Sequence, residues 1–389
     1  MIPKDLFKDK SDILITCPKG LSEYIYRDLL ELKFPVRGRS LNFVKSYGSI
    51  YDCMTLNLCL STAHHILYSL NSFTCNSPND LYREIYSMEW EKLIPIDTNI
   101  CITSIVKNRT IKDSRYANLK CKDAICDRLV LKCNARCGSS SKKDKTVIHL
   151  YWRNENCTVY LDTSGEPLFR RGYRKNAGLA PLQETLANAI VRTSVWNENL
   201  HFINPMCGSG TLAIEAALIA KNRKPQIYRE NFGFMHILQF KKEVFEELKE
   251  KLLCLERPFP SIKLIATDIS DACIKIAKEN AKNAGVLDYI EFKVCPFEDT
   301  PIPNGNGVVI INPEYGIRLG EIDKLKETYK LIGNFFKQKC IGYKCYVFSG
   351  NYELVKRISL KAKKKWDFLN GSLKCRLYEY DIYDLQNSK

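Results

Sequence analysis

The chain has 389 residues, a length that favours two or three domains over one. Its 45% hydrophobic residues are enough for ordinary cores, and its formal net charge of +15 fits a polyanionic partner such as RNA. No apolar run reaches the roughly 18 residues of a membrane span, and the first ten residues lack the apolar core of a signal peptide, so we expect a cytoplasmic protein without a membrane partner.

Short strands and helices alternate through the first part of the chain. Helices are predicted where apolar residues recur every three or four positions, and strands where short apolar runs end at Gly, Pro or Asn. In chain order we expect a strand at 12–20, helices at 21–32 and 49–60, strands near 64–70 and at 100–106, a helix at 116–132, and a hairpin at 147–165.

Basic residues gather on the predicted helix at 116–132, where Lys120 and Lys122 are candidates for contacts with RNA phosphates. A solvated helix face is an equally good interpretation of these lysines. The same region holds the densest group of the chain's 17 cysteines, whose spacing lacks the paired C-x2-C knuckles of common zinc sites. We therefore expect reduced thiols that pack as small hydrophobic side chains, and no metal. The group consists of Cys121, Cys126, Cys133 and Cys137.

The character of the sequence changes after Gly165. Residues 167–175 are basic and aromatic, and Arg170, Arg171 and Arg174 are candidates for RNA contacts. A helix is expected next, with Pro181 in its first turn. From there strands alternate with helices, as in a doubly wound, mostly parallel sheet. We predict helices at 180–192, from 211, at 271–284 and at 322–339, and strands at 201–205, 262–268, 289–295, 307–312 and 343–349.

Two strands of this sheet end in residues that suit a nucleotide-like ligand. The strand at 201–205 runs into a turn in which Gly208 and Gly210 let backbone amides approach a ligand, although a purely structural turn would look similar. The strand at 262–268 ends in Asp268, a typical position for an acid that holds ribose hydroxyls. This acid lies about 60 residues after the glycine turn rather than the usual 20 or so, because residues 221–245 are inserted. Asp268 could also cap the helix that follows it.

A third strand ends in V-V-I-I-N-P-E-Y (308–315). The Asn312 side-chain oxygen and the Pro313 carbonyl can accept the two N–H bonds of a nucleobase amine, which steers its lone pair toward an incoming methyl group. Tyr315 can stack against the base. An ordinary strand-to-loop turn would explain this stretch taken alone. It would not explain why the stretch follows the two earlier motifs in this order.

These motifs resemble a known family. The second half resembles class I S-adenosylmethionine-dependent nucleic-acid methyltransferases with an Asn-Pro-Pro-Tyr motif. More narrowly, the chain resembles the bacterial ribosomal RNA guanine-N2 methyltransferases that carry a THUMP domain. The stretches that carry this resemblance are D-T-S-G-E-P-L-F-R-R-G-Y-R (162–174), A-P-L-Q-E-T-L-A (180–187), N-P-M-C-G-S-G-T-L-A-I-E-A (204–216), N-F-G-F-M-H-I-L-Q-F (231–240), N-P-E-Y-G-I-R-L-G (312–320) and N-G-S-L-K-C-R-L-Y-E-Y (370–380).

The resemblance covers nearly the whole chain and implies three domains. These are an N-terminal ferredoxin-like region at 1–60, a THUMP RNA-binding domain at 61–163 and a class I methyltransferase domain at 164–389. The implied fold is α/β, with a Rossmann-like, doubly wound mixed sheet preceded by an α+β region.

The resemblance also implies transfer of a methyl group from S-adenosylmethionine to N2 of a guanosine in large-subunit ribosomal RNA. Asn312, Pro313 and Tyr315 would hold the flipped guanine. The implied cofactor contacts are Pro205, Met206, Cys207, Gly208, Gly210, Thr211, Asp268, Ile269, Phe297 and Asn312.

Three positions depart from the family pattern. Asn204 stands where the family has an acid before the glycine turn. The family's acid at the adenine amine is missing near Cys295-Pro296-Phe297, where Glu298 or Asp299 could substitute for it. The second proline of the Asn-Pro-Pro-Tyr motif is Glu314, which loosens the restraint on Pro313 but leaves its carbonyl in place. These departures keep a non-catalytic RNA-binding protein open as an alternative.

Other enzymes share part of the pattern. Transfer RNA is an alternative substrate, because THUMP domains serve both kinds of RNA. A DNA adenine methyltransferase would share the Asn-Pro-x-Tyr chemistry but would not account for the first half of the chain.

Overall fold

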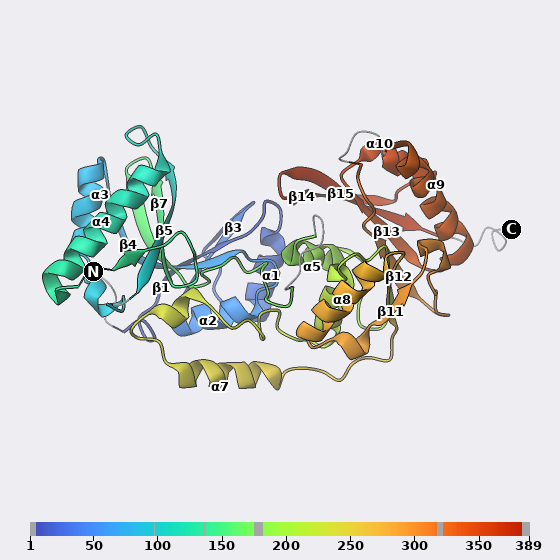
Figure 1. Ribbon diagram of the computed structural model, residues 1–389, viewed down its shortest axis with the longest axis horizontal. Coiled ribbons are helices and arrows are strands. Elements are labelled where there is room, and N and C mark those ends of the chain that lie inside the picture. The colour runs from blue at the N-terminus through green and yellow to red at the C-terminus, as the bar shows by residue number, and fades with distance from the viewer. Residues whose placement is uncertain (1–4, 97, 136, 175–181, 317–321, 383–389) are drawn as a thin grey trace. The chain divides into compact units, whose positions relative to one another are not determined.

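The computed structural model describes residues 5–96, 98–135, 137–174, 182–316 and 322–382. The chain divides into two compact units, which we consider separately (Figure 1). Unit 1 contains Met1–Leu168 and Arg229–Lys251, and unit 2 contains Phe169–Tyr228 and Leu252–Lys389.

Unit 1 is built on one sheet with the strand order β2-β3-β1-β4-β8-β7-β5-β6 within the described ranges. Neighbouring strands are antiparallel except for β5, which runs parallel to both β6 and β7. The strands are β1 (Ser11–Thr16), β2 (Gly38–Ser40), β3 (Phe43–Gly48), β4 (His65–Thr74), β5 (Asn99–Lys107), β6 (Gly138–Ser139), β7 (Thr146–Arg153) and β8 (Asn156–Asp162).

Side-chain caps mark the start of several helices of unit 1, although the helix that follows Leu21 has none. Ser49 and Asp52 form a capping box at the start of α2, in which the Ser49 amide donates to Asp52 Oδ2 at 2.7 Å. Ser77 caps α3, and Pro78 occupies its first turn. The helical elements are α1 (Ser22–Glu31), α2 (Ile50–Cys59), α3 (Pro78–Ser87), η1 (Trp90–Lys92), α4 (Ser114–Cys133), η2 (Gly233–His236) and α7 (Lys242–Leu253).

The segment from Arg229 to Lys251 packs with unit 1, although the sequence interpretation counted it within 164–389. The Phe234 amide donates to the Thr163 carbonyl at 3.0 Å, and Thr146 Oγ1 donates to the His236 carbonyl at 2.7 Å. The Leu238 amide donates to the Leu93 carbonyl at 3.0 Å. These bonds tie the inserted segment to the sheet of unit 1.

The cysteines form no disulfide, and all 17 lie in the described ranges. Cys126 and Cys137 contact each other with their sulfur atoms 3.0 Å apart. Among the described residues, no group of three or more His, Cys, Asp or Glu side chains is placed to hold a metal ion.

Unit 2 contains a sheet with the strand order β11-β10-β9-β12-β13-β15-β14. The first five strands are parallel, and β15 runs antiparallel to both β13 and β14. The predicted doubly wound mixed sheet is therefore confirmed. The strands are β9 (His201–Pro205), β10 (Leu264–Asp268), β11 (Glu291–Val294), β12 (Gly307–Ile311), β13 (Lys344–Ser349), β14 (Lys364–Asn370) and β15 (Leu373–Asp381).

Apolar runs explain which strands lie in the middle of this sheet. Every residue of β12 is buried, as expected for a central parallel strand covered on both faces. Helices α6 and α8 contact β10, and α9 contacts η4, η5 and α10. The helical elements are α5 (Glu184–Thr193), α6 (Thr211–Ala220), α8 (Asp271–Asn283), η3 (Leu287–Tyr289), η4 (Phe297–Asp299), α9 (Ile322–Lys339), α10 (Tyr352–Val355) and η5 (Lys356–Ile358).

Helix α5 begins at Glu184, and Pro181, expected in its first turn, lies outside the described residues. None of the helices in the described ranges combines the length and the apolar character needed to cross a membrane.

Candidate active site

Three loops meet at one edge of the sheet in unit 2. Strands β10, β9 and β12 are parallel neighbours, with Thr267 paired to Pro205 and Ile203 paired to Val309. The residues that follow these strands therefore lie at the same carboxyl edge, where open α/β sheets bind ligands. The structure thus brings together the three motifs that the sequence predicted: the glycine turn, Asp268 and Asn312.

The glycine turn after β9 uses three left-handed residues. Met206, Gly208 and Gly210 have φ angles of 52°, 53° and 79°. A Cβ atom on Gly208 would meet no atom within 4 Å, whereas one on Gly210 would lie 3.0 Å from the Cβ of Ala277 in α8. The space over Gly208 is therefore open to a ligand, and Gly210 is required for the close packing of the turn on α8.

The amide groups at the start of α6 complete this turn. Gly210 is the N-cap residue and offers no side chain to the first helical amides. Burial, with the Asp268 carboxylate nearby, raises the pKa of the Cys207 thiol, so this sulfur carries no charge at neutral pH. The start of α6 therefore presents backbone amides to a polar group of a ligand.

Asp268 joins the end of β10 to the glycine turn. Its Oδ2 accepts the Gly208 amide at 2.9 Å, and its Oδ1 accepts the Ser270 amide at 3.0 Å. The cap of α8 is Ser270, whose Oγ accepts the Cys273 amide at 3.3 Å, so Asp268 does not act as the helix cap. Each Asp268 oxygen keeps a lone pair for a further donor.

Ile269, next to Asp268, gives the site an apolar surface. The residue is 74% exposed, the largest fraction among the exposed large hydrophobic residues of the described chain. An apolar side chain left in water beside an acid suits a ligand that carries a ring on a sugar.

Asn204 replaces an acid at the end of β9 and is buried. Its Nδ2 donates to the Ile310 carbonyl of β12 at 2.9 Å, which ties the two central strands together. Its Oδ1 has no hydrogen-bond partner among the described residues. A buried acceptor of this kind is ready to receive a donor from a ligand.

In the loop after β12, the candidate catalytic residues Asn312 and Tyr315 are hydrogen-bonded to each other. Tyr315 Oη donates to Asn312 Oδ1 at 2.5 Å, and the Tyr315 ring lies edge-on to Phe348 with centroids 6.3 Å apart. Burial raises the pKa of Tyr315 well above its ordinary value, so the hydroxyl keeps its proton and acts as a donor. The sequence predicted a ring that stacks on a base, and the structure adds a hydroxyl that fixes the Asn312 carboxamide.

Two more residues hold the backbone of this loop. Tyr329 of α9 is fully buried, and its Oη donates to the Glu314 carbonyl at 3.1 Å. Asn351, just after β13, donates from Nδ2 to the Tyr315 carbonyl at 3.1 Å. The Glu314 side chain itself is exposed. The loop is therefore fixed through its carbonyls, while the Glu314 carboxylate faces solvent.

The sequence reasoning missed Tyr329 and Asn351. Tyr329 gives no local signal, because it looks like any core residue on the apolar face of a helix. Asn351 does give one, since the buried strand β13 ends in Ser349 and Asn351 follows two residues later, much as Asn312 follows β12.

Arg171 is buried in unit 2 and forms an ion pair with Glu215 of α6. Its Nε lies 2.9 Å from Glu215 Oε1, its Nη2 donates to Glu215 Oε2 at 2.9 Å, and both side chains have 0% exposure. Tyr173 Oη and Asn188 Nδ2 donate to the same carboxylate at 3.2 and 3.0 Å. Burial raises the pKa of Glu215 and the Arg171 charge opposes the rise. In this conformation Arg171 cannot reach a phosphate, so its expected RNA contact is replaced by a structural role.

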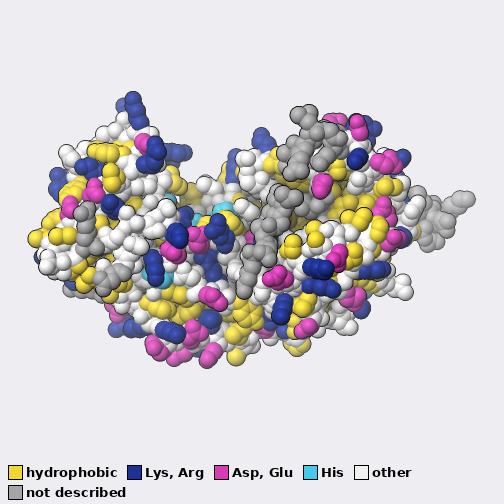
Figure 2. All heavy atoms as spheres, viewed as in Figure 1, with side chains coloured by type: hydrophobic (Ala, Val, Ile, Leu, Met, Phe, Trp, Pro, Cys, Tyr) yellow, Lys and Arg dark blue, Asp and Glu magenta, His cyan; other side chains and the backbone are white. Residues whose placement is uncertain are grey.

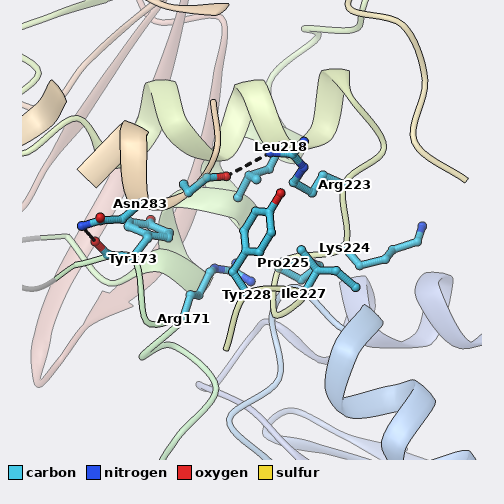
Figure 3. A pocket seen from close by; sticks show the side chains of 10 residues that line it. Arg171, Tyr173, Leu218, Arg223, Lys224, Pro225, Ile227, Tyr228 and Asn283 are labelled. Atoms are coloured by element: carbon cyan, nitrogen blue, oxygen red, sulfur yellow. Dashed lines mark hydrogen bonds between the residues drawn. The ribbon is translucent and has the colours of Figure 1, made fainter. Parts of the chain in front are cut away.

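Arg174 also faces inward. Its Nη2 donates to Thr211 Oγ1 at 2.6 Å and to the Leu182 carbonyl at 3.0 Å, which fixes the first residue of α6. Figure 3 shows the neighbouring bond, in which Asn283 Nδ2 donates to the Tyr173 carbonyl at 3.0 Å. Arg171, Tyr173 and Arg174 therefore pack against α6, which follows the glycine turn, and only Arg170 of the three candidate arginines is exposed.

The remaining candidates lie at different depths. The Phe297 ring is buried and packs at right angles on Phe335, with centroids 5.9 Å apart, so it faces the core. Lys120 Nζ lies about 6 Å from the ring centroids of Tyr82 and Tyr116. Lys122 pairs with its neighbour Asp123 at 3.7 Å. Both lysines are half-buried on α4.

Two parts of the chain match known protein families. Residues 171–379 match the family described as RMKL-like, methyltransferase domain, and residues 75–162 match the THUMP domain. The ribosomal RNA large subunit methyltransferase K/L of Syntrophotalea carbinolica is 32% identical over 379 residues, which cover 94% of the chain and 53% of that protein. The chain spans about half the length of the first curated relatives it matches.

Other similarities extend over whole proteins. A candidate RNA methyltransferase of Synechocystis sp. is 31% identical over 368 residues, which cover 95% of the chain and 96% of that protein. The crystal structure of a candidate methyltransferase complexed with SAH has a TM-score of 0.84 at 24% identity, covering 97% of this chain and 100% of that one. The second similarity shows that the fold is shared over nearly the full chain.

Proposed function

Because the chain belongs to the RMKL-like methyltransferase family and carries a THUMP domain, we propose that it is an RNA methyltransferase. It transfers a methyl group from S-adenosylmethionine to the N2 amine of a guanosine in large-subunit ribosomal RNA. The observation that carries this proposal is the meeting of the glycine turn, Asp268 and Asn312 at one edge of three adjacent parallel strands.

The residues at this edge fit the cofactor. The open space over Gly208 admits its amino-acid part, and the unpartnered Asn204 Oδ1 can accept a donor from it. Asp268 has lone pairs left for the ribose hydroxyls, and the exposed Ile269 can cover a face of the adenine. When bound, the cofactor supplies a methyl group attached to a sulfonium sulfur. Loss of the methyl group turns this sulfonium into a neutral thioether.

Asn312 and Pro313 act on the amine that receives the methyl group. The N2 lone pair of guanine is delocalised into the ring, so the amine must be turned rather than deprotonated. Asn312 Oδ1 has a second lone pair besides the one that accepts from Tyr315, and the Pro313 carbonyl offers another acceptor. Together they take the two N–H bonds, direct the lone pair at the methyl carbon and stabilise the developing positive charge. The surplus proton then leaves to water.

RNA is the proposed partner because the THUMP match and the net charge of +15 both favour a polyanion. The names of the relatives support ribosomal RNA. An RNA substrate and thiols without disulfides support a cytoplasmic location. The exposed Arg170 and the α4 lysines Lys120 and Lys122 stay candidates for phosphate contacts, and the predicted domain limits stay proposals.

Methyl transfer from labelled S-adenosylmethionine tests this function. The purified chain is incubated separately with ribosomal RNA and with transfer RNA from a strain that lacks the gene. We expect label in the large-subunit ribosomal RNA, and none with Asn312→Ala, which should still bind RNA normally. Label in transfer RNA alone would move the substrate to the alternative. Wild-type turnover by Asn312→Ala would overturn the proposed chemistry.

A further inference from the structure

A basic groove lies on the surface of unit 2, and none of its lining residues belongs to the three loops of the active site. It lies between α9 and the short helix η5. Its lining residues are Lys326, Glu327, Lys330, Asn334, Lys337, Arg357, Ile358 and Ser359.

The groove is built by a close approach of the backbone. A Cβ atom on Gly333 would lie 2.0 Å from the Ile358 carbonyl oxygen, so η5 rests directly on α9 at this glycine. Ser359 then adopts a left-handed conformation, with φ of 55°, and turns the chain away from the helix. The position of the Arg357 side chain beside the α9 lysines is therefore set by the fold.

The charge of the groove is strongly positive. Four of its side chains are cationic and one, Glu327, is acidic. Lys326 pairs with Asp323 at 2.7 Å and Lys330 with Glu327 at 3.4 Å. Lys337 and Arg357 are exposed and take part in no ion pair within the part of the chain that the structure describes. On the face visible in Figure 2, Lys and Arg side chains are interspersed with Asp and Glu.

The lysines form a line along one side of α9. Lys326, Lys330 and Lys337 are spaced at i, i+4 and i+11, which places them on one helix face over roughly 16 Å. A line of this length can contact several phosphates of one nucleic-acid strand. The groove offers no exposed apolar anchor, since Ile358 is buried, and protein partners need such an anchor at the centre of an interface.

The helix that carries this line also holds the catalytic loop. Tyr329 lies between Lys326 and Lys330 in sequence but points inward, where its hydroxyl bonds the Glu314 carbonyl. RNA bound in the groove would therefore be fixed to the same rigid helix that positions Asn312 and Pro313.

We propose that the groove between α9 and η5 binds the phosphodiester backbone of the RNA substrate. This inference rests on the proposed function and adds a substrate-binding surface in the methyltransferase unit. Contacts to phosphates position an RNA without reading its sequence, so the groove serves to hold the strand rather than to choose the base.

The salt dependence of RNA binding tests the groove. The variant is Lys337→Gln with Arg357→Gln, and the matched control is Lys278→Gln with Lys282→Gln, two exposed lysines of α8. The probe is a fluorescein-labelled 30-nucleotide RNA hairpin, followed by anisotropy at 50 and 200 mM KCl. A fourfold rise in salt weakens binding by about threefold for each phosphate contact.

We expect the groove variant to lose two phosphate contacts. The factor by which its RNA affinity falls between 50 and 200 mM KCl should then be about nine times smaller than the factor for the wild type. The control variant should behave as the wild type. A wild-type salt slope in the groove variant, or an equal change in both variants, would overturn the proposal. So would loss of binding to poly-glutamate with unchanged RNA binding, which would assign the groove to an acidic protein.

The same samples separate this inference from the proposed function. Methyl transfer to ribosomal RNA by the wild type is measured alongside. A wild type that binds the hairpin with the expected slope but transfers no methyl group would refute the function and leave the groove supported. Methyl transfer with an unaltered slope in the groove variant would refute the groove alone.

Discussion

Replacing Glu215 by Gln removes the charge that neutralises Arg171 beneath the glycine turn. The carboxylate accepts from Arg171, Tyr173 and Asn188, and neither member of the ion pair has any exposed side-chain surface. Breaking a buried pair by removing one partner typically destabilises a protein by about 3–5 kcal/mol, because a charge stays buried without its counter-charge. Gln keeps the volume and one acceptor, so we expect about 3 kcal/mol.

Native-state hydrogen exchange of α6 measures this loss, because it reports the opening free energy of that helix separately from unit 1. Two controls frame the result. Glu256→Gln breaks the pairs with Arg223 and Lys221, whose side chains keep 9% and 13% of their surface exposed, so it should cost less than Glu215→Gln. The double variant Arg171→Met with Glu215→Leu removes both charges and should be less destabilised than Glu215→Gln. Protection of α6 within 1 kcal/mol of wild type in Glu215→Gln, or a double variant as unstable as the single one, would refute the reasoning.

Three further predictions concern pH and the catalytic loop. Burial lowers the pKa of His149 to about 4, against about 6.5 when unfolded. The unfolded chain therefore takes up a proton that the folded chain does not, so the free energy of unfolding should fall as pH drops from 6.5 to 4, by up to about 1.4 kcal/mol per pH unit. Urea titrations should show a free energy of unfolding that depends less steeply on pH in His149→Gln than in the wild type. The same dependence in both proteins would contradict this. Tyr315→Phe loses the hydrogen bond to Asn312 but keeps the ring, so its kcat should fall roughly fivefold. The kcat of Tyr315→Ala should fall further. Equal kcat values for the wild type and Tyr315→Phe would leave the hydroxyl without a role. Glu314→Gln and Glu314→Pro should keep activity if only the backbone of this residue matters; a loss of guanine preference in both, measured on guanosine- and adenosine-containing RNA, would assign base recognition to the carboxylate.

The fold follows from the sequence where periodicity and turn chemistry are strong. The alternation of buried strands and amphipathic helices predicted the five parallel strands β9 to β13 of unit 2. The polar residues that end β9, β10 and β12 predicted the functional edge of this sheet. The short strands β2 and β3 were not predicted, because they contain too few apolar residues to show a period.

Long-range pairs were beyond local reasoning. Arg171 looked like an RNA ligand because it stands in a basic stretch, but its partner Glu215 lies 44 residues away. One signal was present, since Glu215 is the lone charge in the apolar helix T-L-A-I-E-A-A-L-I-A and a charge there needs a buried partner. Tyr329 and Asn351 reach the catalytic loop only through the packing of α9 and β13 against it.

The identity of the methylated nucleoside tests the central claim most directly. Large-subunit ribosomal RNA from a strain without the gene is incubated with the protein and S-adenosylmethionine, digested to nucleosides and examined by mass spectrometry. The proposed function predicts a gain of N2-methylguanosine that is absent with Asn312→Ala. A gain of N6-methyladenosine, or no methylated nucleoside from protein that binds the cofactor, would contradict it.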